Sequence, residues 1–123
     1  MTFELAKTFR FESAHLLPYV PDGHKCGRLH GHSFRVDIVV TGDAQPLTGW
    51  VVDYGDISAA VRPIVDALDH RYLNEIAGLE NPTSEVLCAW LWEHLAPGLP
   101  GLAAVTVRET CTTACTYRGP RKA

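Results

Sequence analysis

The stretch Thr2–His15 (TFELAKTFRFESAH) decides the fold, because apolar and polar side chains alternate along it. The large apolar side chains keep to odd positions, namely Phe3, Leu5, Phe9 and Phe11. A period of two indicates a long β-strand with one face buried. With the alternation continued to its end, His15 points to the same side as the phenyl rings, towards the interior.

The rest of the chain supplies the other elements of the predicted fold. We expect a second strand at about 33–41, a helix from Asp53 or Asp56 to about Leu68, a second helix from the start signal Asn81–Glu85 to about Leu95, a third strand with Val105, Val107 and Glu109, and a fourth at 114–118. Pro63 should kink the first helix or shift its start. The order ββααββ predicts an α+β fold, an antiparallel sheet with two helices on one face. Its two open edges, in so small a domain, indicate that other subunits complete the sheet.

Composition limits the function classes. The 123 residues are 46% hydrophobic and 20% charged, which is typical of one globular domain, and we assign residues 1–123 to it. A net charge of -3 gives no basic footprint for nucleic acid. Charged residues recur through the first 14 positions, and no apolar run approaches the roughly 20 residues that span a bilayer. We therefore expect a cytoplasmic protein with no membrane partner, whose four cysteines are thiols.

The histidines at the start of the second strand predict a transition-metal site, most simply zinc. Residues i and i+2 of a strand point to the same side, so His30 and His32 can chelate one ion. His15 ends the neighbouring strand and adds a third imidazole. Three imidazoles with a fourth position open are typical of catalytic zinc. Cys26 leaves two alternatives open: a fourth ligand that closes a structural site, or a thiolate beside the metal that acts as a base.

Three further side chains are candidates for chemistry. Asp69 and His70 can form an acid/base pair, although adjacent residues need not touch, and Asp69 could instead cap a turn with His70 at the surface. Glu109 is predicted on the inward face of the third strand, where a carboxylate is costly unless it is paired. It could grip two parallel N–H groups of a heterocycle, or form a salt bridge with an arginine.

Five motifs resemble, in order and spacing, those of the 6-pyruvoyl-tetrahydropterin synthase superfamily. They are Phe11–His15 (FESAH), Cys26–His32 (CGRLHGH), Leu68–His70 (LDH), Asn81–Glu85 (NPTSE) and Glu109–Cys111 (ETC). Together they cover nearly the whole chain and form a specific set, whereas no single one would be specific. The stretches His24–His32 and Val52–Tyr54 are most similar to the bacterial branch, whose members make 6-carboxy-5,6,7,8-tetrahydropterin.

The resemblance implies a structure and a set of roles. Its fold is the tunnelling fold, in which ββααββ subunits join their sheets into a β-barrel, two rings stack as a homohexamer (a dimer of trimers), and each active site lies between subunits. The implied ligands of one zinc ion per subunit are His15, His30 and His32. Cys26 would remove a proton from the substrate side chain, and Asp69 and His70 would relay protons. Glu109 would anchor the pterin ring.

The implied activity is that of a lyase in queuosine or 7-deazapurine biosynthesis. It converts 7,8-dihydroneopterin triphosphate into 6-carboxy-5,6,7,8-tetrahydropterin, acetaldehyde and triphosphate. Two alternatives remain: a 6-pyruvoyl-tetrahydropterin synthase, which eliminates triphosphate and keeps the carbon chain, and a non-catalytic metal-binding or purine-binding module on the same fold.

Overall fold

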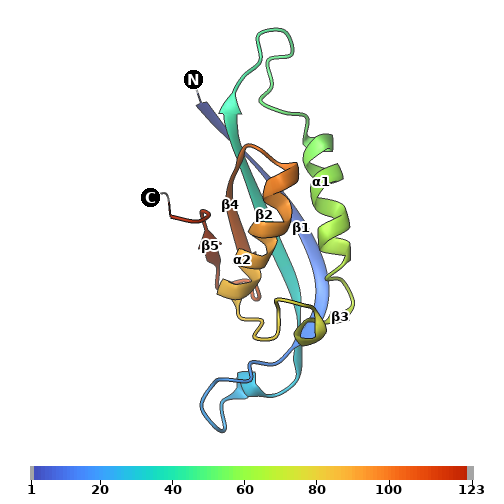
Figure 1. Cartoon of the computed structure of the whole chain (residues 1–123), viewed down its shortest axis with the longest axis vertical. Helices are drawn as coiled ribbons and strands as arrows, with labels where there is room; N and C mark the ends of the chain where they lie inside the picture. Colours follow the sequence, from blue (N-terminus) through green and yellow to red (C-terminus); the bar gives the residue numbers. More distant parts are fainter. Residues whose placement is uncertain (1, 122–123) are drawn as a thin grey trace.

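The computed structural model describes residues 2–121 and contains one five-stranded sheet with two α-helices (Figure 1). The strands are β1 (Thr2–His15), β2 (His30–Asp43), β3 (Arg71–Tyr72), β4 (Leu102–Arg108) and β5 (Cys115–Tyr117), and the helices are α1 (Tyr54–Asp66) and α2 (Ser84–Leu95). The strand order across the sheet is β3-β1-β2-β4-β5. The predicted α+β class and the order of the six predicted elements are confirmed.

The two long strands form one continuous antiparallel pair. They are in register from Thr2 opposite Asp43 to His15 opposite His30. The prediction for β1 is therefore confirmed, while β2 begins at His30, earlier than the expected start at Ser33. The extension follows from the pairing itself, because every residue at the end of β1 has a partner on β2. In Figure 1 this pair forms the long axis of the sheet, with loops extending beyond it at both ends.

The expectation of a purely antiparallel sheet is wrong at one edge. β3, which the sequence analysis did not predict, pairs parallel with β1 through Ser13 and Ala14. Two residues are too few to produce a periodic pattern, so their strand conformation comes from contact with β1. Among residues 2–121, no other strand pairs with that edge of β1, so most of its length remains open.

Both helices start where their capping residues predict. The Asp53 side chain accepts a hydrogen bond from the Gly55 amide, and the Thr83 side chain accepts one from the Val86 amide. Pro63 lies inside α1 and does not shift its start. α1 ends at Asp66, two residues before the expected end, and α2 ends at Leu95 as predicted.

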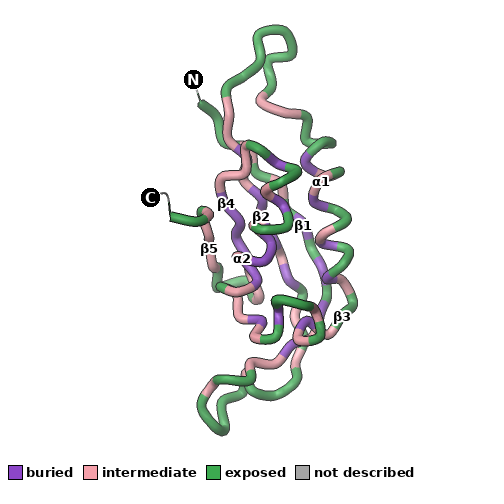
Figure 2. Tube along the Cα trace, in the orientation of Figure 1, coloured by how far each residue is buried: buried purple, intermediate pink, exposed green. Residues whose placement is uncertain are grey.

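The core lies between the helices and one face of the sheet. Figure 2 shows buried residues concentrated along the inner parts of the strands and α2. The alternating residues of β1 and β2, the apolar positions of both helices, and Val105 and Val107 of β4 form one buried cluster. Phe11 and Phe34 stack within it, with ring centroids 4.8 Å apart. Among the described residues, no helix is long and apolar enough to cross a membrane.

Glu109 does not lie on a strand, contrary to the prediction. β4 ends at Arg108, and Glu109 occupies the bend that leads to β5. Arg108 is the last β4 residue to pair with β2, opposite Arg35, so the ladder stops there. The backbone turns at this point and carries the Glu109 side chain towards the first turn of α2.

Candidate metal centre and active site

The three predicted histidines come together at one end of the β1–β2 pair. His15 and His30 are opposite each other, and His32 lies two residues further along β2 on the same side. One ring nitrogen from each can be chosen so that all lie within 4.8 Å of one another. Among the described residues, these three form the one group of three or more ligand-type side chains that could hold a metal ion. The geometry that strand alternation predicted is thus present.

Backbone carbonyl groups fix the orientation of two of these rings. Nδ1 of His15 is 2.9 Å from the Pro82 carbonyl oxygen, and Nδ1 of His30 is 2.7 Å from the Arg28 carbonyl oxygen. A carbonyl can only accept, so each Nδ1 carries the proton and each Nε2 presents a lone pair. Histidines that bind metals commonly make such a second hydrogen bond, which sets the tautomer.

Buried ring nitrogens without partners provide an independent test of whether a metal fits. Within residues 2–121, Nε2 of His15 and Nε2 of His32 are buried and make no hydrogen bond. An unpaired buried polar atom is costly, and a cation between the rings would satisfy both. Burial lowers the pKa of His15 and of His32; the hydrogen bond to Pro82 at His15, and the charge of Glu109 at both, only partly oppose it. Neutral imidazole is the form that binds metal, so the donor set fits a transition metal.

The Glu109 carboxylate lies beside this cluster at the start of α2. Its Oε1 accepts a hydrogen bond of 3.0 Å from the Ser84 hydroxyl, and its Oε2 is 3.8 Å from Nε2 of His32. The second distance is too long for a hydrogen bond. Among residues 2–121, no arginine forms the salt bridge to Glu109 that was the alternative. The Ser84 hydroxyl thus holds Oε1 of the carboxylate in place, while Oε2 can still accept a hydrogen bond from a ligand. The sequence analysis did not identify Ser84 as a partner of Glu109.

Cys26 lies in a short 3-10 turn, Lys25–Gly27, within the loop between β1 and β2. Its side chain is half-buried, and its Sγ atom is not part of the group of candidate ligands. The His24 side chain accepts a hydrogen bond of 3.0 Å from the Cys26 amide, and the Cys26 carbonyl accepts one of 2.8 Å from the Leu17 amide. These two hydrogen bonds fix the Cys26 backbone within the loop, and both alternatives for its side chain, a fourth ligand or a base, remain predictions.

Asp69 and His70 touch each other, which adjacency alone could not establish. Nδ1 of His70 is 3.0 Å from Oδ1 of Asp69, and the same oxygen accepts a hydrogen bond of 2.8 Å from the Glu12 amide. Hydrogen bonds from Glu12 and His70 lower the pKa of Asp69, so it is ionised near neutral pH. His70 has a φ of 57°, in the left-handed region, and its side chain is 78% exposed.

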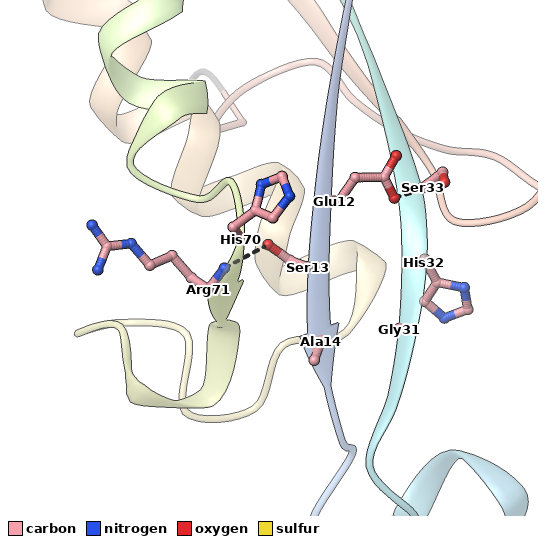
Figure 3. A pocket seen from close by; sticks show the side chains of 8 residues that line it. All are labelled: Glu12, Ser13, Ala14, Gly31, His32, Ser33, His70 and Arg71. Carbon is pink, nitrogen blue, oxygen red and sulfur yellow. Dashed lines mark hydrogen bonds between the residues drawn. The ribbon is translucent and has the colours of Figure 1, made fainter.

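The Asp69–His70 pair does not join the histidine cluster within one chain. His70 lines an open pocket of about 570 Å³, together with Glu12, Ser13, Ala14, Gly31, His32, Ser33 and Arg71 (Figure 3). In that view β1 and β2 lie between the rings of His70 and His32. Glu12 and Ser33 point to the face opposite the phenyl rings, because side chains alternate along a strand. His70 is therefore held at the edge of β1, where its amide donates to the Glu12 carbonyl, and the two strands separate it from His32 although both residues line the same pocket.

Comparison with known proteins identifies the family. A family model described as 6-pyruvoyl tetrahydropterin synthase matches residues 4–120. The chain is 48% identical over 121 residues to the 6-carboxy-5,6,7,8-tetrahydropterin synthase of Synechocystis, covering 94% of this chain and 92% of that protein. It is 32% identical over 130 residues to the protein of the same name from Bacillus subtilis, covering 98% and 88%.

Solved structures agree on the fold. The 6-pyruvoyl tetrahydropterin synthase of Caenorhabditis elegans superposes with a TM-score of 0.90 at 24% identity, covering 98% of this chain and 97% of that one. This similarity establishes the fold alone, whereas the two named relatives and the family model establish membership of the family. The resemblance carried by the five motifs is confirmed, and the chain belongs to the 6-pyruvoyl tetrahydropterin synthase family, as a lyase related to the 6-carboxy-5,6,7,8-tetrahydropterin synthases.

Proposed function

We propose that the protein is a zinc-dependent lyase of queuosine or 7-deazapurine biosynthesis. With one water molecule, it would convert 7,8-dihydroneopterin triphosphate into 6-carboxy-5,6,7,8-tetrahydropterin, acetaldehyde and triphosphate. The observation that carries the proposal is the convergence of His15, His30 and His32, with two buried Nε2 atoms that lack partners. The names of the two relatives supply the product.

The site residues of this chain have distinct roles in the proposed reaction. Bound zinc would act as a Lewis acid towards the side-chain oxygens of the substrate and make the neighbouring C–H more acidic. Cys26 removes that proton as a general base. Glu109 receives the N–H groups of the pterin ring, with Ser84 holding one carboxylate oxygen in place. Asp69 orients His70, which passes protons to and from the reacting side chain.

A complete site would need more than one copy of the chain. The Asp69–His70 pair lies at the edge of β1 and outside the group of three histidines, so a second copy would bring its own pair to the first copy's metal. The open edge of β1 and the exposed side chains of Phe3, Trp50 and Tyr54 support such an assembly. We propose a homohexamer built as a dimer of trimers, with the sheets joined into a β-barrel, and light scattering at defined concentration tests its mass.

The rival reaction is that of a 6-pyruvoyl-tetrahydropterin synthase, the activity after which the matching family model is named. Incubation of metal-quantified protein with 7,8-dihydroneopterin triphosphate separates the two, because acetaldehyde forms only when the carbon chain is cleaved. We expect 6-carboxy-5,6,7,8-tetrahydropterin and acetaldehyde in equal amounts. A pyruvoyl product without acetaldehyde would overturn the proposal, and Cys26→Ala that retains zinc and full activity would overturn the role of Cys26.

A further inference from the structure

Asn74 is the centre of a hydrogen-bond arrangement next to the metal cluster. It lies in the 3-10 turn Leu73–Glu75, which follows β3. Its Oδ1 accepts a hydrogen bond of 3.1 Å from the Leu16 amide, and its Nδ2 donates one of 2.8 Å to the Leu16 carbonyl. The carboxamide thus pairs with both backbone groups of one residue, as a neighbouring strand would.

The residue that Asn74 holds is the one directly after the ligand His15. β1 ends at His15, and the chain then enters the loop Leu16–Arg28. Without the Asn74 carboxamide, both polar backbone groups of Leu16 would lose their partners at a half-buried position, which costs free energy. We call these two hydrogen bonds between Asn74 and Leu16 the clamp. The clamp extends the ordered backbone of β1 by one residue beyond His15.

The same side chain reaches the segment that orients the His15 ring. Nδ2 of Asn74 also donates a longer hydrogen bond of 3.4 Å to the Glu80 carbonyl. Glu80 lies two residues before Pro82, whose carbonyl accepts from Nδ1 of His15. Asn74 consequently connects the backbone that carries His15 to the loop that carries its hydrogen-bond acceptor. Leu73 and Leu79 are fully buried on either side, so this segment is anchored in the core.

We propose that Asn74 is a positioning residue for the metal centre, which sets the place and the ring orientation of His15. The inference rests on the proposed metal centre and not on the proposed reaction. Partners of this kind outside the ligand shell typically contribute about 10–100-fold to metal affinity. We expect the dissociation constant for zinc to rise by about that factor when the clamp is lost.

Asn74→Asp is the sharpest variant, because it keeps the shape and the acceptor for the Leu16 amide but removes the Nδ2 donor. The added negative charge by itself would favour a nearby cation, so a loss of zinc affinity cannot arise from charge. Asn81→Asp is the matched control, since it introduces the same charge in the same loop at a side chain that makes no hydrogen bond to any of residues 2–121, its backbone carbonyl accepting from the Thr83 amide. Asn74→Ala removes the clamp without adding charge.

Competition with a chromophoric chelator measures zinc affinity, and the visible spectrum of the Co²⁺-substituted protein reports on ligand geometry. We expect weaker zinc binding and an altered cobalt spectrum in both Asn74 variants, and an unchanged Asn81→Asp protein. Zinc affinity within threefold of the wild type would refute the inference even if the metal-free variants melt at lower temperature, because that result describes a purely structural residue. Equal losses in Asn74→Asp and Asn81→Asp would refute it too. Should a metal-free variant not fold, the rate at which chelator removes zinc from the loaded protein gives the same comparison. A wild type that binds zinc but forms no acetaldehyde would overturn the reaction and leave this inference standing.

Discussion

Glu109→Gln is the substitution that tests ring anchoring most directly. The amide has the shape of the carboxylate but offers one acceptor and one donor. Its oxygen can keep the hydrogen bond from Ser84, which then turns the NH₂ group towards the place where Oε2 lies 3.8 Å from His32. An N–H group of the pterin ring would there meet a donor. The fold should survive, because the contact that holds the side chain in place is retained.

The expected loss follows from the hydrogen bonds affected. A hydrogen bond to a charged group contributes about 1.5–3 kcal/mol, and the substitution removes one such bond and neutralises the other. We therefore expect pterin binding to weaken by about 3 kcal/mol, which corresponds to roughly 100-fold in the dissociation constant. Ser84→Ala leaves the carboxylate charged and should cost about tenfold or less.

Fluorescence titration with neopterin, which carries no triphosphate, measures this binding apart from turnover. Glu93→Gln provides the control, because Glu93 is exposed on α2 and the same chemical change there should leave binding unaltered. Zinc content must be quantified alongside, since Glu109 also faces the histidines. A dissociation constant for Glu109→Gln within threefold of the wild type, at full zinc occupancy, would refute the anchoring role.

Three further predictions concern stability. Burial raises the pKa of Asp37, but hydrogen bonds from one threonine and two arginines outweigh it and hold the pKa below the usual 3.8. The ionised Asp37 therefore stabilises the folded state fully above that pH, and this stabilisation is lost as the pH falls through the folded pKa. In urea unfolding between about pH 2 and pH 6, the free energy of unfolding of Asp37→Asn should fall less steeply with decreasing pH than that of the wild type. Equal slopes for the two proteins would contradict this. Thr83→Ala removes the cap of α2 and should cost about 1 kcal/mol by the same assay, whereas Thr83→Ser should restore most of it; two equal losses would count against the cap. Gly119→Ala places a Cβ in steric overlap with the Trp92 ring at a φ of 89°, whereas Gly23→Ala at a φ of 82° meets nothing within 4 Å. Both substitutions should lower the free energy of unfolding by about 1 kcal/mol or more through backbone strain, and Gly119→Ala should lower it further through the clash. Equal melting temperatures for the two variants would contradict this.

The fold was predictable wherever a periodic pattern or a cap was long enough to be read. The alternation of β1 predicted its buried face and the direction of His15, and Thr83 within the Asn81–Glu85 stretch marked the start of α2. β3 has two residues and is produced by contact with β1, so no local signal exists for it. The end of β4 before Glu109 depends on where the ladder to β2 stops, which the sequence of β4 alone does not contain.

The candidate site divides in the same way. The convergence of the three histidines followed from strand geometry, because residues at fixed spacing on paired strands must share a side. The carbonyl of Pro82 and the side chains of Ser84 and Asn74 could not be assigned, because these groups act from loops and helix ends brought close by the tertiary fold. Nor could residue spacing show that β1 and β2 separate the ring of His70 from that of His32.

The unbroken pairing of β1 with β2 has a consequence for how a metal ion and the folding chain interact. A hairpin of this length can pair out of step, and a slip of one residue would turn His30 and His32 to the side away from His15. Only correctly paired chains would then offer three imidazoles to one ion. Because a ligand draws the population towards the form that binds it, a metal ion bound by the three histidines would stabilise the correct strand register relative to the slipped ones.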